Sequence, residues 1–187
     1  KREPLLYSVP LQKASQNRMI SETMVAEGHW RDKLLKTMET NYRNAPFYAD
    51  VKPLLELIFS ISGSPISELA ARSVIEVCHY CEIPLDARFS SQMKYDREGN
   101  GQSKILSLCR CLDGTCYLNM EGGRELYEQE AFQQKGVDLK FLSPQLDPYL
   151  QGSKNAPFIP GLSAIDILMF NPPEQAARIL SARTDTM

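Results

Sequence analysis

The sequence has almost no excess of either charge. Its 21 basic and 23 acidic side chains leave a formal net charge of −2 and a pI near 5.8. Proteins that hold nucleic acid or an anionic membrane surface through their overall field carry a clear positive excess. We therefore expect no nucleic acid among the partners of this protein.

Long apolar runs are missing as well. No stretch reaches the roughly 18 consecutive apolar residues of a membrane-spanning helix, and the first residues lack the pattern of a secretory signal peptide. The sequence thus predicts a cytoplasmic protein without a membrane span. Because the chain begins at Lys1 and soon enters an apolar segment, we expect a further segment upstream of it.

Five cysteines, an odd number, do not suggest a disulfide framework. Three of them, Cys109, Cys111 and Cys116, fall inside predicted regular structure, which favours reduced thiols. Cys78 and Cys81 form a CxxC pair, but they end a predicted helix, where the helix dipole disfavours thiolate. A zinc site is the alternative to buried small side chains, and we assign no metal ligands.

The usual catalytic arrangements are also absent. His29 and His79 are the two histidines, and no serine or aspartate at a telling spacing accompanies either of them. A phosphate-binding P-loop needs the order Gly-Lys-Ser/Thr, whereas the chain reads Gln102-Ser103-Lys104, so a Walker-type nucleotide site is not expected. The catalytic residues therefore stay unassigned.

The stretch from Ser103 to Phe141 organises the chain. An amphipathic helix is followed by an apolar strand over 115–120, a glycine pair that opens a second helix, and another strand over 137–141. Alternating helices and strands are typical of a parallel sheet covered by crossover helices. We therefore predict an α/β fold with a parallel, Rossmann-like sheet.

The glycine pair marks the candidate binding site. Gly122 and Gly123 directly follow a strand, and Arg124 offers a fork of donors suited to phosphate or carboxylate. Ser103 and Lys104 begin the preceding helix, and two helix N-termini at one sheet edge would converge on a single crevice. We predict an anion site there; the alternatives are a plain glycine turn, a solvated arginine and a serine N-cap.

Three helical patterns precede this stretch, over 30–42, 47–61 and 66–81. They predict a helical insertion over about 30–82 within a single α/β domain spanning 1–187. Further strands are expected at 5–11, 19–24 and 87–91, and a final helix at 174–182.

Asp166 is the one charged residue of an otherwise apolar helix over 162–171. A lone buried carboxylate costs several kcal/mol unless it is paired. A capping box with Ser163 as N-cap would satisfy it, and a role in the binding site is the alternative. The proline-rich segment before this helix carries Tyr149 and Phe158, which predict a packed loop.

Four blocks of residues, in a set order, span nearly the whole chain. They are Tyr7-Ser8-Val9-Pro10; Trp30 with Asn41-Tyr42 and Ala45-Pro46-Phe47-Tyr48; Tyr117-Leu118 with Gly122-Gly123-Arg124, Tyr127, Phe132 and Gly136; and Pro160 with Leu162-Ser163-Ala164-Ile165-Asp166 and Asn171. The ordered set resembles the WbqC-like proteins of bacterial surface-polysaccharide gene clusters. Asn119-Met120 stands where that family shows Ser-Gly, and the family's upstream strand and loop are absent from these residues.

The resemblance implies a nucleotidyltransferase-like fold and a transferase or ligase. Its members look like enzymes that modify an amino sugar or sugar nucleotide by joining an amino acid or acyl group through an amide. ATP or a nucleotide sugar is then the candidate cosubstrate, a small molecule is the expected partner, and a homo-oligomer is left open.

Within such an enzyme, the anion site would hold the substrate, and Tyr127 or Asp166 would orient its polar groups. A function of another class stays open beside it. The protein would then be a non-catalytic binding or assembly module that docks a partner through the helices from Trp30 to Cys81.

Overall fold

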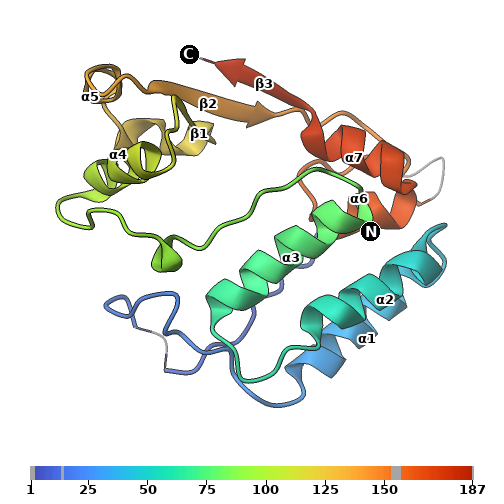
Figure 1. The fold of residues 1–187 in the computed structure, drawn as a ribbon. Coiled ribbons are helices and arrows are strands. Elements are labelled where there is room, and N and C mark those ends of the chain that lie inside the picture. Colours follow the sequence, from blue (N-terminus) through green and yellow to red (C-terminus); the bar gives the residue numbers. More distant parts are fainter. Residues whose placement is uncertain (1–2, 14, 153–156, 187) are drawn as a thin grey trace. The chain divides into compact units, whose positions relative to one another are not determined.

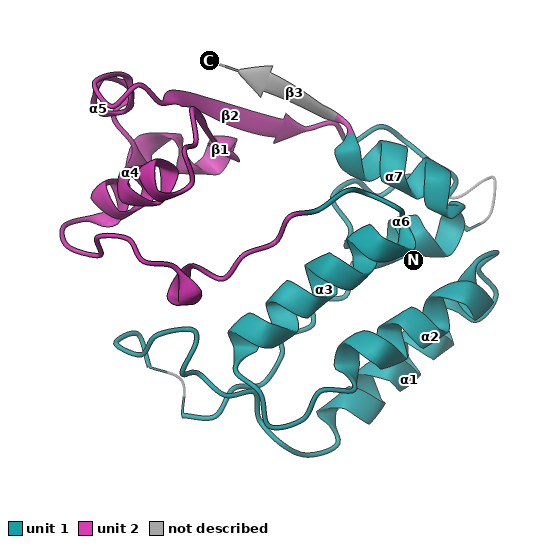
Figure 2. Ribbon diagram, viewed as in Figure 1, with its two compact units in different colours: residues 1–85, 146–181 teal, residues 86–145, 182–187 magenta. Residues whose placement is uncertain are grey.

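The computed structural model describes residues 3–13, 15–152 and 157–186. The chain divides into two compact units, shown in Figure 2. Unit 1 comprises residues 1–85 and 146–181, and unit 2 comprises residues 86–145 and 182–187. The single domain and the helical insertion expected from the sequence stay predictions.

Unit 1 is helical. Its first three helices agree with those predicted from the sequence, because each carries an apolar face at helical spacing. Two further helices near the C-terminus complete the unit, the second of them close to the predicted final helix. The bounds are α1 (Trp30–Tyr42), α2 (Tyr48–Phe59), α3 (Ile66–Tyr80), α6 (Ala164–Phe170) and α7 (Pro173–Ser181), as labelled in Figure 1.

The core of unit 1 is centred on α2. Leu168 and Met169 of α6 are fully buried in the same cluster, and the Phe47 N–H donates to the Met169 carbonyl over 3.2 Å. Helix α2 thus packs on α6, which stands more than a hundred residues later. The buried side chains of α2 are Val51, Leu54, Leu55 and Ile58.

The strands expected at 5–11 and 19–24 are wrong. Both segments are irregular, and their pairing is limited to single bridges such as that between Leu11 and Val25. Pro10 has no N–H to donate to a ladder, and the leucines before it are exposed, so no buried face fixes a strand register.

Unit 2 contains the predicted succession of helices and strands. Strands β1 and β2 are parallel, with Cys116 opposite Asp138 and Met120 opposite Leu142, and β3 adds to β2 in the antiparallel sense. Tyr117 lies on the same face of the sheet as the buried cluster of this unit. The elements are η1 (Ser90–Gln92), α4 (Gly101–Cys111), β1 (Cys116–Met120), the 3₁₀ helix η2 (Glu121–Leu126), α5 (Gln129–Gln133), β2 (Asp138–Pro144) and β3 (Arg183–Thr186).

The fold class is therefore mixed α/β and mostly helical, and the described residues do not form the predicted Rossmann-like sheet. The described residues form one small sheet in the order β1-β2-β3, with a single parallel pair. The strand expected at 87–91 is an extended segment that ends in η1. A short apolar alternation forms a strand only where a neighbouring strand can pair with it.

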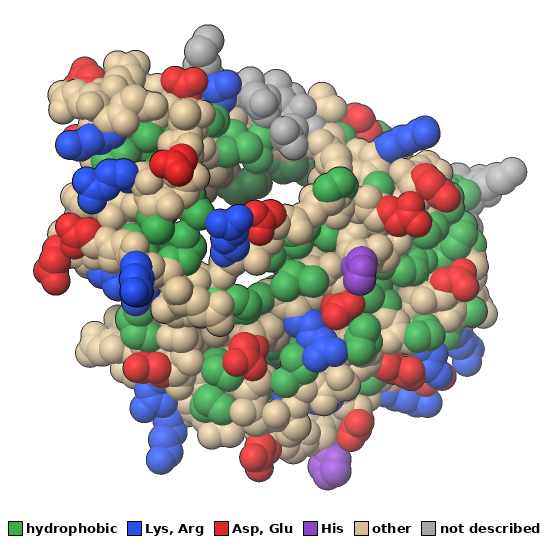
Figure 3. Space-filling model, viewed as in Figure 1, with side chains coloured by type: hydrophobic (Ala, Val, Ile, Leu, Met, Phe, Trp, Pro, Cys, Tyr) green, Lys and Arg blue, Asp and Glu red, His purple; other side chains and the backbone are tan. Residues whose placement is uncertain are grey.

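Charged side chains of both signs are interspersed on the face drawn in Figure 3, in keeping with the small net charge. None of the helices in the described ranges is long and apolar enough to cross a membrane.

Candidate functional site

The first turn of α4 is capped three residues earlier than the sequence suggested. Asn100 is the N-cap, and its side-chain oxygen accepts hydrogen bonds from the Ser103 N–H at 2.9 Å and the Ser103 hydroxyl at 3.0 Å. Ser103 is thus the third residue of the helix rather than its cap. The Lys104 side chain is exposed and forms no ion pair within the described residues.

The glycine pair lies inside η2 rather than in a turn that opens an α-helix. Neither Gly122 nor Gly123 has a positive φ, and α5 starts only at Gln129. A side chain at Gly123 would meet the side chain of Asn119. A Cβ at this position would lie 2.7 Å from the amide nitrogen of Asn119, whose oxygen accepts from the Met120 N–H at 2.8 Å.

One hydrogen bond ties these two segments together. The Glu128 N–H, just before α5, donates to the side-chain oxygen of Gln102 in the first turn of α4 over 2.7 Å. The first turn of α4 therefore lies beside the segment that follows η2. We call this part of unit 2 the α4–η2 edge: Ser103, Lys104, Gly122, Gly123, Arg124 and Tyr127.

Fewer backbone N–H groups are available to bind a ligand at this edge than the sequence suggested. The Ser103 N–H is taken by Asn100, and the Glu128 N–H is taken by Gln102. An anionic ligand would therefore depend on side chains, chiefly the Lys104 ammonium and the Arg124 guanidinium.

Arg124 is held by a carboxylate and an aromatic ring. Its Nε and Nη2 donate to the two oxygens of Glu121 at 2.6 and 3.0 Å, and its guanidinium lies 4.3 Å from the centre of the Phe141 ring. The hydrogen bonds to Glu121 raise the pKa of Arg124. The pair is about half exposed, so a ligand with a phosphate or carboxylate group can compete with Glu121 for the same fork.

Tyr127 points into unit 2. Its hydroxyl lies 3.1 Å from that of Tyr117, and its ring meets those of Tyr117 and Phe132 with centroids 5.5 and 5.7 Å away. Burial raises the pKa of Tyr117, and the bond to Tyr127 raises it further. Tyr127 thus anchors the end of η2, and its role in orienting a substrate stays a prediction.

Asp166 belongs to unit 1, whereas the other six predicted residues belong to unit 2. Its carboxylate is 5% exposed and accepts hydrogen bonds from the hydroxyls of Tyr42 at 3.0 Å and Tyr149 at 2.6 Å. Ser163 does cap α6 through the Ile165 N–H, as predicted, but the carboxylate is satisfied by the two tyrosines instead of a capping box.

The amide of Gln151 extends this network. It donates to the Tyr149 hydroxyl at 3.1 Å and to the Ile159 carbonyl at 3.0 Å, and it accepts from the Ile159 N–H at 2.8 Å. Burial raises the pKa of Tyr149, and the bond to Asp166 raises it further. We call Tyr42, Tyr149, Gln151 and Asp166 the buried polar cluster.

The WbqC-like protein family matches residues 1–178, which is nearly the whole chain. The chain belongs to this family. No curated protein and no solved structure gives a match. Most of each unit of this WbqC-like protein falls within the matched range, and the residues of the α4–η2 edge and of the buried polar cluster all lie in it.

Sequence reasoning missed most of the buried polar cluster. Asp166 stood out as a charge in an apolar helix, but its partners come from positions 42 and 149. One signal for the cluster was present in the sequence, the lone carboxylate itself, because a buried carboxylate needs hydrogen-bond donors.

The thiols of this WbqC-like chain form no comparable arrangement. Burial raises the pKa of Cys81, and the described residues hold no group of three metal-ligating side chains.

Proposed function

We propose that this WbqC-like protein transfers a group to an amino sugar or sugar nucleotide in surface-polysaccharide biosynthesis, forming an amide, and that its α4–η2 edge holds the anionic part of a substrate. Family membership supports the biological setting. One structural observation supports the site: the Glu128 N–H donates to the side-chain oxygen of Gln102 over 2.7 Å and so joins the first turn of α4 to the segment that follows η2. Ligands of α/β proteins commonly bind where such strands end.

The proposed step joins an acyl group to an amine. The carboxylate of the acyl donor attacks the α-phosphorus of ATP, so that a C–O–P linkage forms and pyrophosphate leaves with the electron pair. The amine nitrogen of the sugar then attacks the acyl carbon, the C–N bond forms, AMP leaves with the electrons of the C–O bond, and one amine proton passes to water.

Positive charge at the α4–η2 edge would act on the phosphates. Lys104 supplies a compact charge, and Arg124 supplies a planar fork once it shifts from Glu121. Such groups stabilise the charge that gathers on a leaving phosphate. The hydroxyl of Ser103 is a further donor at the same helix turn.

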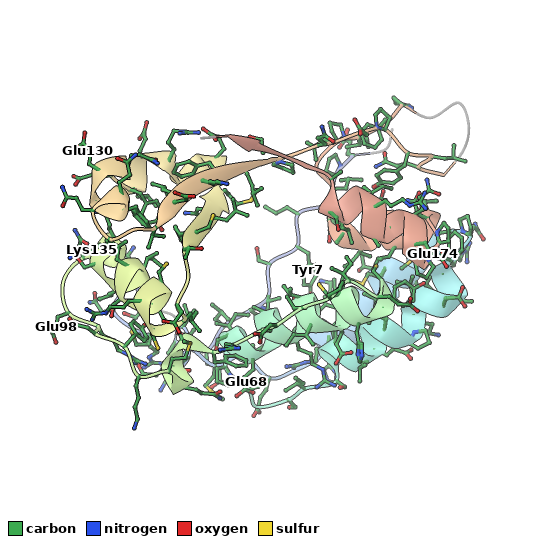
Figure 4. The ribbon with its side chains drawn as sticks, turned by 45° about the horizontal axis from the view of Figure 1, so that its top comes forward. Tyr7, Glu68, Glu98, Glu130, Lys135 and Glu174 are labelled. Atoms are coloured by element: carbon green, nitrogen blue, oxygen red, sulfur yellow. The ribbon has the colours of Figure 1, made fainter. Side chains whose placement is uncertain are left out.

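The test is the formation of AMP and of an amide. The protein is incubated with ATP, a panel of amino acids and an amino-sugar nucleotide, and products are followed by mass spectrometry. We expect Lys104→Ala and Arg124→Ala to lower kcat/KM by about tenfold or more, the value of a lost charged hydrogen bond. Lys135→Ala is the matched control, because this exposed lysine stands just after α5, outside the edge (Figure 4).

The assay also identifies the outcomes that contradict the proposal. AMP release that is equal in wild type, Lys104→Ala and Arg124→Ala would remove the edge from the reaction. Absence of AMP release and of any amide product across the panel would remove the amide-forming reaction itself.

A second candidate function is a binding or assembly module, and exposed apolar side chains on α3 favour it. Val74 and Ile75 are 56% and 36% exposed. In this case the protein would self-associate through these residues. Sedimentation velocity of wild type against Val74→Lys tests it: association that is unchanged in the variant, or a monomeric wild type, would exclude this surface.

A further inference from the structure

The later turns of α4 face a segment of chain that precedes the helix. The Asp96 N–H donates to the Ser107 hydroxyl oxygen at 2.9 Å, and the Cys111 thiol donates to the Lys94 carbonyl at 3.4 Å. Ser107 and Cys111 are one turn apart, so the segment runs along the helix in the opposite direction and is fastened to it twice.

An open pocket of about 540 Å³ lies between this segment and α4. Sites for small ligands are typically concave and about 300–1,000 Å³ in volume. All the lining residues belong to unit 2, and none of them is part of the α4–η2 edge. They are Lys94, Tyr95, Asp96, Ser107, Arg110 and Cys111.

The charges of this pocket favour an anion. Lys94 and Arg110 line it, and neither forms an ion pair with another described residue. Asp96 is the one acidic residue of the lining, and its Oδ1 already accepts from the Glu98 N–H at 2.9 Å. The Glu98 side chain itself extends outward from the segment (Figure 4). The lining therefore carries two positive charges against one negative charge.

The remaining groups supply donors and rigidity. Ser107 accepts a hydrogen bond from Asp96, so its own hydrogen is left to point to a ligand. Arg97 binds within the segment that precedes α4. Its guanidinium lies 4.7 Å from the centre of the Tyr95 ring, and its Nη2 donates to the carbonyls of Ser90, Ser91 and Met93. The ring of Tyr95 is thereby fixed at the pocket wall.

We propose that this pocket binds a phosphate group, either as inorganic phosphate or as part of a small phosphorylated molecule. The guanidinium of Arg110 matches the oxygens of a phosphate in pairs, the ammonium of Lys94 adds a point charge, and the Ser107 hydroxyl adds a donor. This site is separate from the edge proposed to hold the substrate, and it does not depend on the reaction proposed there.

The lining cysteine gives a readout that localises the ligand. Cys111 and Cys116 are both exposed, but only Cys111 lines the pocket. Alkylation by the neutral reagent iodoacetamide is followed with increasing inorganic phosphate, at ionic strength held constant with chloride. Tandem mass spectra of the tryptic peptide that ends at Arg124 distinguish the thiols; this peptide begins at Cys111 in the wild type and at Ile105 in Arg110→Gln.

We expect phosphate to slow alkylation of Cys111 saturably and to leave the rate of Cys116 unchanged. Lys94→Ala and Arg110→Gln should each raise the dissociation constant for phosphate by about tenfold or more, while Lys135→Ala leaves it unchanged. A second series with UDP distinguishes the two sources. A lower dissociation constant for UDP than for inorganic phosphate indicates a phosphorylated molecule, and the reverse indicates free phosphate.

Three results would overturn the proposal. Cys111 and Cys116 could slow equally, which would mean a general salt effect. Phosphate could have no saturable effect on Cys111. Arg110→Gln could lower the thermal midpoint while leaving the phosphate dissociation constant unchanged, in which case Arg110 serves only the C-terminal dipole of α4.

Discussion

Replacing Asp166 by alanine should destabilise unit 1 more than most single changes. The substitution removes the acceptor of two hydrogen bonds, from the hydroxyls of Tyr42 at 3.0 Å and Tyr149 at 2.6 Å, at a position that is 5% exposed. The two phenols come from α1 and from the loop before α6, so the carboxylate fastens both to α6.

The magnitude follows from those two bonds. A hydrogen bond to a charged group contributes about 1.5–3 kcal/mol, so two contribute about 3–6 kcal/mol. Removal of a buried carboxylate also removes its desolvation penalty, which offsets part of that loss. We expect Asp166→Ala to cost about 2–4 kcal/mol, and Asp166→Asn, which keeps one acceptor oxygen, to cost about half as much.

Urea unfolding followed by tryptophan fluorescence measures this cost, because the one tryptophan, Trp30, begins α1 in unit 1. A double-mutant cycle between Asp166→Ala and Tyr149→Phe isolates the shorter bond, and we expect a coupling of about 1.5 kcal/mol or more. A cost under about 0.5 kcal/mol for Asp166→Ala, the range of a surface change, would refute this reasoning, as would strict additivity in the cycle.

Three further predictions concern other contacts. Arg124→Ala should leave the midpoint of urea unfolding nearly unchanged, since its ion pair with Glu121 is half exposed, and a clear fall of that midpoint would make this arginine structural. Gly123→Ala should destabilise by about 1 kcal/mol, because the new Cβ displaces Asn119 from its hydrogen bond, and the double variant with Asn119→Ala should cost about as much as either single change, because both changes remove the same bond; additive costs would contradict the contact. The raised pKa of Tyr149 means that its contribution to stability is complete below about pH 10 and declines above it, as the unfolded chain loses the phenolic proton first. The free energy of unfolding, measured by urea titration between pH 9 and 11, should therefore fall less steeply with pH for Tyr149→Phe than for the wild type, by under about 1.4 kcal/mol per pH unit because the group is partly solvated, and parallel curves would contradict it.

The sequence predicted best where one apolar face decides the structure. The three helices of the N-terminal half bury residues such as Val51 and Leu69 at helical spacing, and the parallel pair of β1 and β2 follows from two short apolar runs separated by a crossover. Local pattern alone is sufficient in these cases, because burial and secondary structure agree.

It predicted poorly where partners distant in sequence decide. The segments at 5–11 and 87–91 resemble short strands in composition, but no neighbouring strand pairs with them among the described residues, and β3 pairs with β2 across some forty residues. The glycine pair lies in a 3₁₀ helix, and the approach of Asn119 to Gly123 is a contact that no spacing rule reveals. The candidate site shows the same limit. The side chains of Asn100 and Gln102 accept hydrogen bonds from the Ser103 and Glu128 N–H groups, and neither bond was predicted from the sequence.

Calorimetric titration of ATP and of an amino-sugar nucleotide into the protein tests most directly whether the α4–η2 edge holds an anionic substrate. The account predicts saturable binding of at least one of them, weakened about tenfold or more by Lys104→Ala and by Arg124→Ala and unchanged by Lys135→Ala. Equal affinity in all four proteins, or no binding of either ligand, would contradict it.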